Sequence, residues 1–329
     1  MIAAIINNTP EKVRSVYDSS VLSRIGVSEC VYSRDDVIGA PEMFSDTRYI
    51  FSTWGMPVFT EEEIERCFPS LECVFYAAGS VQAFARPFLL RGVRVFSAWA
   101  ANAVPVAEYT LSQILLANKG FFSYTHLCDS RDRRRLAELK GYFPGNYGER
   151  VGLIGVGMIG SLVAQMLQEH RLEVLAYDPF LSDERAELLG VRRTSLEEIF
   201  SSCSVISNHL ANNPRTVGML GYGLFSLMRP HAVFINTGRG AQVVEDDLVR
   251  VLRERPDTVA LLDVTYPEPC AHDHPFHELP NCILTPHIAG SMGDEPRRMA
   301  EYMELEYSRV VGGEAPMYEV DLDMLATMA

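Results

Sequence analysis

The stretch "VGLIGVGMIGSLVAQMLQEH", residues 151–170, decides the fold of this chain. It opens with an apolar run typical of a buried strand and continues with apolar side chains at helical spacing. Between the two, Gly155, Gly157 and Gly160 have G-x-G-x-x-G spacing. The first glycine permits a tight turn, the second lets backbone approach a pyrophosphate, and the third lets helix and strand pack closely. The stretch therefore predicts the strand–turn–helix unit of a dinucleotide-binding α/β domain.

The next predicted strand, "EVLAYD" at residues 173–178, ends in a carboxylate 18 residues after Gly160. A carboxylate at this place accepts hydrogen bonds from the adenosine ribose hydroxyls and repels a 2′-phosphate. Pro179 and Phe180 follow Asp178, so no arginine comes next to receive that phosphate. We therefore predict NAD rather than NADP as the cofactor. The alternative is a glycine turn in an α/β protein that binds no nucleotide.

Apolar, β-branched runs alternate with helix-length segments almost throughout the chain. Such runs predict parallel strands buried on both faces and joined by right-handed crossovers. The fold class expected is α/β, with two doubly wound parallel-sheet domains: a Rossmann NAD-binding domain and a flavodoxin-like substrate (catalytic) domain. The helix pattern at residues 105–120 is the expected boundary between them. The expected strands are residues 2–6, 30–33, 48–52, 73–77, 93–97, 151–155, 173–178, 203–208, 232–236, 259–264 and 282–286.

Composition bounds the class of protein. The chain has 329 residues, 47% hydrophobic and 22% charged, as in a globular protein of two domains. A net charge of −14 disfavours non-specific binding to nucleic acid or to anionic membranes. No segment reaches the ~20 apolar residues that cross a bilayer, and residues 1–10 lack the basic start of a signal peptide. Seven scattered cysteines without a CxxC pair indicate reduced thiols, so we expect a cytoplasmic protein.

Three polar residues follow predicted strands near the end of the chain: Arg239 in "NTGRG", Glu268 in "LDVTYPEP" and His287 in "LTPHIAG". Each has an ordinary structural explanation by itself: a loop salt bridge, a solvated turn residue and a packed histidine. Ligands of open α/β sheets bind at such strand ends. Together, the arginine can bind a substrate carboxylate, the glutamate can hold one imidazole nitrogen, and the histidine can transfer a proton at a carbonyl or hydroxyl oxygen.

With these motifs in place, the sequence resembles the D-2-hydroxyacid dehydrogenase family. The resemblance rests on "AAGSV", "NAVPVAEYTL", "VGLIGVGMIG", "YDP", "NHLANNPRT", "NTGRG", "LDVTYPEP" and "LPNCILTPHIAG". Glu268 lies 29 residues after Arg239, and His287 lies 19 residues after Glu268, as this family leads us to expect. In the family's organisation, residues 1–102 and 292–329 would form the substrate-binding domain, and residues 103–291 the NAD-binding domain.

The resemblance implies a role for each site residue. His287 would be the general acid in ketone reduction and the base in the reverse direction, tuned by Glu268. Arg239 would bind the carboxylate of the 2-oxo acid, and backbone N–H groups near Gly79 and Ser80 would hold its other side. The expected cofactor contacts are Gly155, Gly157, Met158, Ile159, Gly160, Asp178, His209, Leu210, Pro214, Thr237, Gly238, Asp263 and Gly290. The family also implies a hinge between the domains and a homodimer.

The sequence departs from the family near the expected substrate. Phosphoglycerate-oxidising relatives usually carry an arginine after the third strand, where this chain has "FSTWGMP". We therefore expect a smaller or less charged substrate, with Trp54 as a wall of its pocket; interior packing of Trp54 is the alternative. The loop "AAGSVQA" lacks an aspartate common in relatives, which would alter the shape of the substrate loop.

Two further clusters have ordinary explanations. The run "RDRRR", residues 131–135, reads as a solvated helix face rather than a phosphate or nucleic-acid site. The segment "CAHDHPFHELP", residues 270–280, resembles a set of metal ligands. Relatives carry a similar loop, and hydride transfer to NAD needs no metal, so we expect a loop near the mouth of the cleft and no metal.

The sequence thus predicts an NAD-dependent oxidoreductase that interconverts a 2-oxo acid and a D-2-hydroxy acid. We expect the reductase direction on small acids of the glyoxylate or hydroxypyruvate kind. The alternative is an NAD(H)-sensing regulator of the corepressor type on the same fold. Such a regulator would carry an added interaction tail or peptide-binding insertion, and neither is evident in the sequence.

Overall fold

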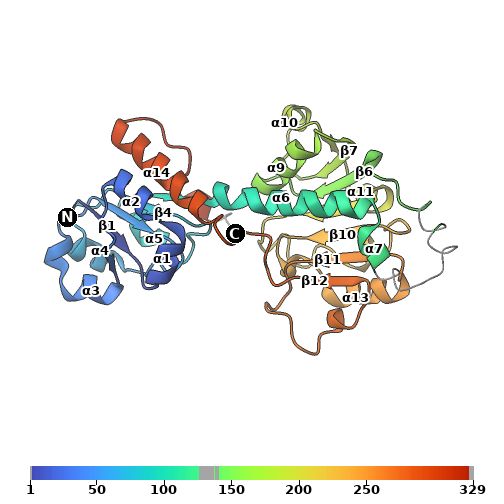
Figure 1. The fold of residues 1–329 in the computed structure, drawn as a ribbon, viewed down its shortest axis with the longest axis horizontal. Helices are drawn as coiled ribbons and strands as arrows, with labels where there is room; N and C mark the ends of the chain where they lie inside the picture. The colour runs from blue at the N-terminus through green and yellow to red at the C-terminus, as the bar shows by residue number, and fades with distance from the viewer. Residues whose placement is uncertain (1, 126–136, 138–140, 326–329) are drawn as a thin grey trace. The chain divides into compact units, whose positions relative to one another are not determined.

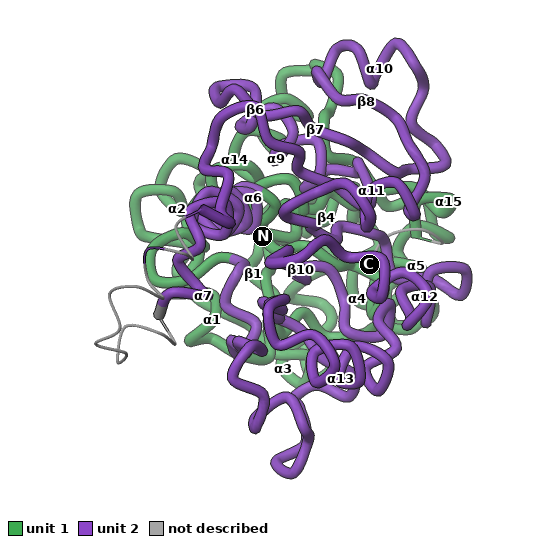
Figure 2. The backbone as a smooth tube through the Cα atoms, turned by 90° about the vertical axis from the view of Figure 1, so that its right-hand side faces the viewer, with its two compact units in different colours: residues 1–103, 291–329 green, residues 104–290 purple. Residues whose placement is uncertain are grey.

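The computed structural model describes residues 2–125, 137 and 141–325. The basic run at 131–135 and Cys128 lie outside the described residues. The chain divides into two compact units, residues 1–103 with 291–329 (unit 1) and residues 104–290 (unit 2), which Figure 2 distinguishes by colour. The chain therefore passes from one unit to the other twice, at 103/104 and at 290/291.

Unit 1 is built on a six-stranded sheet with strand order β13-β5-β4-β3-β1-β2. Helices lie on both sides of this sheet (Figure 1), and its buried residues form one core cluster. The strands are β1 (Ala3–Ile6), β2 (Val31–Tyr32), β3 (Tyr49–Ser52), β4 (Cys73–Tyr76), β5 (Arg94–Ser97) and β13 (Glu319–Val320). The helices are α1 (Pro10–Val16), α2 (Ser19–Ile25), α3 (Arg34–Gly39), α4 (Glu61–Cys67), α5 (Ala85–Leu90), α14 (Arg297–Gly312) and α15 (Leu322–Leu325).

Unit 2 is built on a seven-stranded parallel sheet with strand order β12-β11-β10-β9-β6-β7-β8. The strands are β6 (Tyr147–Ile154), β7 (Arg171–Tyr177), β8 (Arg192–Arg193), β9 (Val205–Asn208), β10 (Val233–Asn236), β11 (Val259–Leu262) and β12 (Cys282–Leu284). The helices are α6 (Trp99–Asn118, which begins in unit 1), α7 (Phe121–Thr125), α9 (Met158–Leu167), α10 (Asp183–Leu188), α11 (Leu196–Ser202), α12 (Tyr222–Phe225) and α13 (Glu245–Glu254).

Neighbouring residues of the strands in unit 2 belong to two different cores. Val205 and Val233 pack with α6 and α9, whereas Ile206 and Phe234 pack with α11, α12 and α13. Side chains alternate between the faces of a strand, so a strand covered by helices on both faces is apolar at every position. The continuous apolar runs in the sequence follow from this arrangement, and the predicted class of two doubly wound α/β sheets is confirmed.

Two short edge strands and one helix start were not predicted. The two-residue strands β8 and β13 are too short to leave a pattern, and β13 pairs antiparallel with β5, so the first sheet is not wholly parallel. Helix α6 begins at Trp99 and contains Pro105 in its interior, whereas the sequence indicated a start at Pro105. Near the two crossings, the side chain of Asn102 accepts a hydrogen bond from the Ser291 N–H at 3.1 Å.

No helix in the described part of the chain combines the length and the apolar character that a bilayer crossing needs. The six cysteines within the described residues are free thiols.

Candidate functional site

The glycine loop joins β6 to α9 at the carboxyl end of the second sheet. Gly155 has φ +87°, and a Cβ there would lie 2.7 Å from the carbonyl oxygen of His209. A Cβ on Gly160 would lie 2.1 Å from the carbonyl oxygen of Gly155. Both glycines are therefore required by the protein's own packing. Gly155 is required by the turn, and Gly160 is required by the close contact of helix and strand.

Gly157 is different, because its surroundings do not require a glycine. It is the residue before α9, and a Cβ there would meet nothing within 4 Å. Met158 and Ile159 form the start of α9, whose first N–H groups have no intrahelical acceptor. Open space beside backbone N–H groups at a helix start suits a pyrophosphate. The loop thus fits the phosphates of a dinucleotide.

Asp178 directly follows β7 and lies beside this loop. Its carboxylate accepts hydrogen bonds from the N–H groups of Val156, at 2.8 Å, and Phe180, at 2.8 Å. Arg185 of α10 donates to the Val156 carbonyl oxygen at 3.2 Å and to the Ser161 hydroxyl at 2.9 Å. The sequence predicted the acidic residue at this place. It did not reveal the arginine, which reaches the loop only through the placement of α10.

His209, a predicted cofactor contact, is buried beneath the glycine loop. Its Nε2 lies 2.9 Å from the Ser207 hydroxyl, and its Nδ1 has no hydrogen-bond partner among the described residues. Burial lowers the pKa of His209 from 6.5 to about 4. The backbone of His209 lies next to Gly155, since its carbonyl oxygen is the atom that a Gly155 Cβ would meet.

This burial predicts a loss of stability in acid. The unfolded state binds a proton at His209 near pH 6.5 and the folded state only near pH 4, so the free energy of unfolding falls as the pH drops through this window. We expect His209→Gln to reduce the loss between about pH 7 and about pH 4.5 by about 2 kcal/mol. Urea unfolding of both proteins at the two pH values measures this. The same acid loss in both would show that His209 is not its source.

The three remaining strand-end residues follow adjacent strands: Arg239 follows β10, Glu268 follows β11 and His287 follows β12. The Nδ1 of His287 lies 2.5 Å from a carboxylate oxygen of Glu268. Both side chains are largely exposed in unit 2, 46% for His287 and 40% for Glu268. The pairing commits Nδ1 to the glutamate and leaves Nε2 for another partner. The pair agrees with the expectation that Glu268 holds one imidazole nitrogen, and only the structure identifies that nitrogen as Nδ1.

The backbone holds His287 in an uncommon conformation, with φ +55°. Its N–H donates to the carbonyl oxygens of Asp263 and Thr285, both at 3.0 Å. The buried Asp263 carboxylate accepts hydrogen bonds from the Thr285 hydroxyl at 2.6 Å and from the N–H groups of Ile288 and Ala289 at 2.8 and 2.9 Å. Four hydrogen bonds to one buried residue thus fix the segment that carries the histidine.

Two side chains of α6 reach the same strand ends. The hydroxyl of Tyr109 lies 3.2 Å from that of Thr285. Since the Thr285 hydroxyl donates to Asp263, Tyr109 donates to Thr285. Next along the helix, the Thr110 hydroxyl lies 3.2 Å from that of Thr237, a predicted cofactor contact that is itself buried. The sequence did not single out Tyr109 and Thr110 as site residues, because α6 carries other polar residues as well.

A buried amide network lies under Arg239. The side-chain amide of Asn208 donates to Asn236 at 3.0 Å and to Gln242 at 2.6 Å, and Gln242 donates to the carbonyl oxygen of Leu210 at 2.6 Å. The Gln242 oxygen also accepts the Arg239 N–H at 3.2 Å, and Asn236 donates to the Arg239 carbonyl oxygen at 3.2 Å. The network joins the segments after β9 and β10, so it positions Leu210 and Arg239 together.

The glycines on either side of Arg239 allow close packing. A Cβ on Gly238 would lie 3.0 Å from the Asn208 amide, and a Cβ on Gly240 would lie 2.1 Å from the carbonyl carbon of Thr265, in the segment leading to Glu268. One guanidinium N–H of Arg239 donates to the Gly238 carbonyl oxygen at 2.8 Å. Its other guanidinium nitrogens have no hydrogen bond to any residue that the structure describes, so they are available to an anion.

Two predicted cofactor contacts lie elsewhere at this edge. Pro214 is exposed in the segment between β9 and α12, and Gly290 is partly buried at the last position of unit 2.

The predicted substrate contacts Trp54, Gly79 and Ser80 all belong to unit 1. Trp54 follows β3, and Gly79 and Ser80 follow β4, its neighbour in the sheet. The Ser97 hydroxyl donates to the Gly79 carbonyl oxygen at 2.5 Å. No described residue accepts the N–H of Gly79 or Ser80, and a Cβ on Gly79 would meet nothing within 4 Å. These N–H groups can therefore receive a carboxylate.

The histidines of the segment 270–280 contact other protein groups. His274 lies 3.5 Å from a Glu245 carboxylate oxygen, and the His277 ring is bonded to the Ala271 carbonyl oxygen at 3.1 Å. Within the described ranges, no three His, Cys, Asp or Glu side chains come together in a way that could hold a metal ion.

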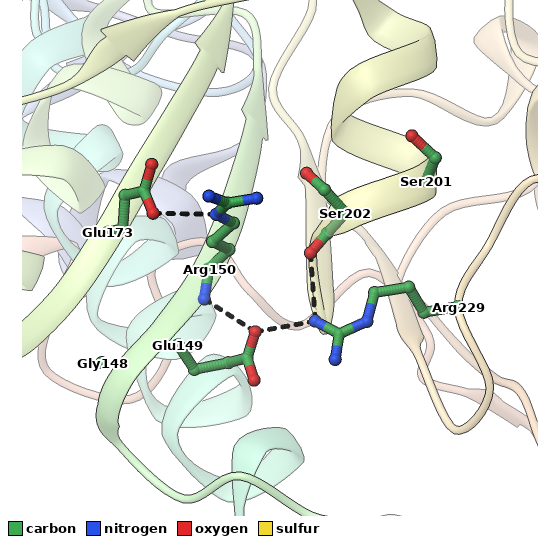
Figure 3. Close-up of a pocket in the computed structure, with 7 residues that line it drawn as sticks. All are labelled: Gly148, Glu149, Arg150, Glu173, Ser201, Ser202 and Arg229. Carbon is green, nitrogen blue, oxygen red and sulfur yellow. Dashed lines mark hydrogen bonds and ion pairs between the residues drawn. The ribbon is translucent and has the colours of Figure 1, made fainter.

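A cavity of about 440 Å³ lies at the opposite edge of the second sheet, around the start of β6 (Figure 3). Arg150 pairs there with Glu173 at 2.8 Å, and Arg229 pairs with Glu149 at 2.8 Å. The charges that line the cavity thus neutralise one another. The glycine loop follows the other end of β6, so this cavity is separate from the candidate site.

The fold and the site together define an NAD-binding α/β protein with an Arg, Glu and His set at the strand ends. Residues 111–289 match the NAD-binding domain of the family described as D-isomer specific 2-hydroxyacid dehydrogenase. The chain belongs to this family, and its cofactor is NAD.

Curated relatives carry related names. The chain is 33% identical to a D-3-phosphoglycerate dehydrogenase of Archaeoglobus fulgidus, over 61% of this chain and 38% of that protein. It is also 33% identical to the putative 2-hydroxyacid dehydrogenase YoaD of Bacillus subtilis, over 61% of this chain and 59% of that protein. The chain thus spans less than two thirds of the length of either relative.

Solved structures share the fold over the whole chain. A phosphoglycerate oxidoreductase from Rhizobium etli has a TM-score of 0.78 at 22% identity, covering 98% of this chain and 99% of that one. The NAD-complexed D-isomer specific 2-hydroxyacid dehydrogenase from Lactobacillus delbrueckii ssp. bulgaricus has a TM-score of 0.77 at 20% identity, covering 97% and 99%. At these identities the likeness establishes the fold alone.

Proposed function

We propose that the protein is an NAD-dependent dehydrogenase that interconverts a 2-oxo acid and a D-2-hydroxy acid. The observation that carries the proposal is the pairing of His287 with Glu268 at 2.5 Å. These two residues follow β12 and β11, and Arg239 follows the neighbouring strand β10 of the same NAD-binding unit. Such a pair prepares an imidazole for proton transfer, because the carboxylate holds one ring nitrogen and leaves the other to exchange a proton with a reacting oxygen.

In this proposal the imidazole of His287 transfers the proton, and the carboxylate of Glu268 holds that imidazole in position. The glutamate accepts the Nδ1–H, so Nε2 is the nitrogen that donates a proton to the carbonyl oxygen during reduction and removes it from the hydroxyl during oxidation. The hydrogen bonds that the segment around His287 donates to Asp263 and to the Thr285 carbonyl oxygen hold the backbone that carries the ring and reduce the entropy lost on reaching the reactive geometry.

Arg239 recognises the carboxylate of the substrate. A guanidinium binds a planar carboxylate through two parallel hydrogen bonds. Among the described residues, the Arg239 guanidinium donates only to the carbonyl oxygen of Gly238. We propose that the N–H groups of Gly79 and Ser80 bind the other side of that carboxylate. Trp54 would then form a wall beside the rest of the substrate.

The cofactor would be held by the glycine loop through its pyrophosphate and by Asp178 through a ribose. Thr237, Leu210 and Gly290 would lie along its nicotinamide half, whereas His209 and Asp263 would support it from below. When bound, NADH supplies the hydride that reduces C2 of the 2-oxo acid. In this assignment residues 103–291 bind NAD, and residues 1–102 with 292–329 bind the substrate.

A direct test is NADH oxidation with glyoxylate, hydroxypyruvate, pyruvate and bulkier 2-oxo acids, followed by absorbance. We expect turnover of at least one acid, with NADPH a poorer donor because Asp178 repels a 2′-phosphate. Arg239→Gln should raise KM for that acid. NAD binding without turnover of any acid would favour the alternative, an NAD(H)-sensing regulator.

We further propose a homodimer, on the basis of the family. Sedimentation velocity of the purified chain tests this, and a single species with the mass of one chain would contradict it.

A further inference from the structure

The carboxyl edge of the first sheet brings together a cation and an indole from separate elements. Lys12 of α1 follows β1, and Trp54 follows β3, the next strand in the sheet. The ammonium nitrogen of Lys12 lies 6.0 Å from the centroid of the Trp54 ring. Forty-one residues separate them in sequence, so the pair exists only in the folded protein.

The turn that carries Trp54 is held firmly in place. The buried side chain of Asn7 donates to the carbonyl oxygens of Thr53 at 3.1 Å and Trp54 at 3.2 Å. The Asn8 N–H donates to the Gly55 carbonyl oxygen at 3.0 Å. Gly55 has φ +100°, and a Cβ there would lie 2.6 Å from the Thr9 hydroxyl. The backbone that carries the indole is therefore held in place, by a turn that requires glycine at position 55.

No residue that the structure describes neutralises the charge of Lys12. Its side chain is exposed and, in the part of the chain that the structure describes, has neither a hydrogen bond nor an ion pair. Arg34, also at this edge, shows the contrast, because it is paired with Glu63. An ammonium that rests on an aromatic face and lacks a carboxylate partner can receive an anion from a ligand.

The spacing of the strands relates this pair to the proposed carboxylate contacts. Gly79 and Ser80 follow β4, which pairs with β3, and β3 pairs with β1. Neighbouring strands lie about 4.8 Å apart, so the ends of β4 and β1 are about 10 Å apart. The long side chain of Lys12 can bring its ammonium group closer to the N–H groups of Gly79 and Ser80 than the strand ends themselves are. The arrangement suits a molecule with two acidic groups separated by a few carbon atoms.

We propose that Lys12 and Trp54 form the subsite for the far end of the substrate, and that Lys12 selects 2-oxo acids bearing a second anionic group there. This rests on the proposed function. It also revises the expectation of a less charged substrate, which followed from the absence of an arginine after the third strand. Here the cation comes from a different element, the helix after the first strand.

The test compares acids that share a carbon chain and differ in the distal charge. 2-Oxoglutarate against 2-oxovalerate examines a carboxylate, and 3-phosphohydroxypyruvate against hydroxypyruvate examines a phosphate. For Lys12→Met, which keeps the apolar stem, we expect the ratio of kcat/KM for the charged acid to that for its uncharged partner to fall about tenfold in at least one pair. The pair with the larger fall identifies the anion. Lys12→Arg should retain most of the ratio.

Arg14→Met is the matched control, because it removes a positive charge from the same helix and should leave both ratios unchanged. Ratios unchanged in Lys12→Met, or a wild-type preference for both uncharged acids, would overturn the subsite while leaving the dehydrogenase intact. Failure of the proposed function has a different signature, since the wild-type protein would then turn over no 2-oxo acid at all.

Discussion

Replacing His287 with asparagine is expected to lower kcat about 1,000-fold and to leave NAD affinity within about twofold, because general acid–base catalysis contributes 10²–10⁴-fold. Asparagine is the informative substitution, since His287 has φ +55° and asparagine tolerates the left-handed region better than most residues. The backbone of the segment is then retained, and only the proton-transferring ring is lost. Steady-state kinetics and an NAD titration measure the two quantities.

His287→Ala and Glu268→Gln complete this experiment. Alanine should lose as much activity as asparagine, because both lack the imidazole. Glu268→Gln keeps the shape of the partner at 2.5 Å but removes its charge, and we expect a smaller loss in kcat, about 10–100-fold. If His287→Asn kept activity, or lost NAD affinity in proportion to kcat, the residue would have a structural role instead.

The second large effect is expected at Gly160. A Cβ there would lie 2.1 Å from the carbonyl oxygen of Gly155, a backbone atom that cannot rotate away. Gly160→Ala must therefore push α9 away from the strand end, which we expect to cost about 1–3 kcal/mol of the free energy of unfolding, as overpacked sites do. The same shift moves the N–H groups that would bind the pyrophosphate, so NAD affinity should fall at least tenfold. Urea unfolding and an NAD titration measure these changes.

The variant Gly157→Ala separates the loss of stability from the loss of NAD affinity. A Cβ at Gly157 meets no protein atom within 4 Å, so the free energy of unfolding should change by less than about 1 kcal/mol. The added methyl group would occupy the space assigned to the phosphates, and NAD affinity should still fall. Unchanged affinity in Gly157→Ala would mean that the open space beside the loop is not the pyrophosphate site.

Much of the site was predictable because its signals are local. The spacing of Gly155, Gly157 and Gly160 reports backbone conformation and close packing within one strand–turn–helix unit. Asp178 directly follows the next strand, where parallel topology fixes its place relative to the loop. Arg239, Glu268 and His287 each follow an apolar run, and parallel strands bring their carboxyl ends to one edge.

The supports of these residues were not predictable in the same way. Asn208, Asn236 and Gln242 read as ordinary polar residues in the sequence, yet they form one buried network that positions Arg239. Asp263 was expected to line the cofactor, and the sequence did not reveal that its carboxylate also holds the segment that carries His287. Hydrogen-bond partners in loops depend on the directions of the side chains, and the periodic pattern of apolar residues in the sequence does not predict these directions.

The sequence by itself determined the two α/β sheets, the NAD-binding loop and the identity of the three strand-end residues. These follow from apolar periodicity, from glycine stereochemistry and from the rule that parallel strands end at a common edge. The tertiary structure alone decided that Glu268 holds His287 through Nδ1 and that Lys12 lies over Trp54. Such contacts join residues of different helices and loops, and their geometry is set by how these elements pack, which the order of residues does not encode locally.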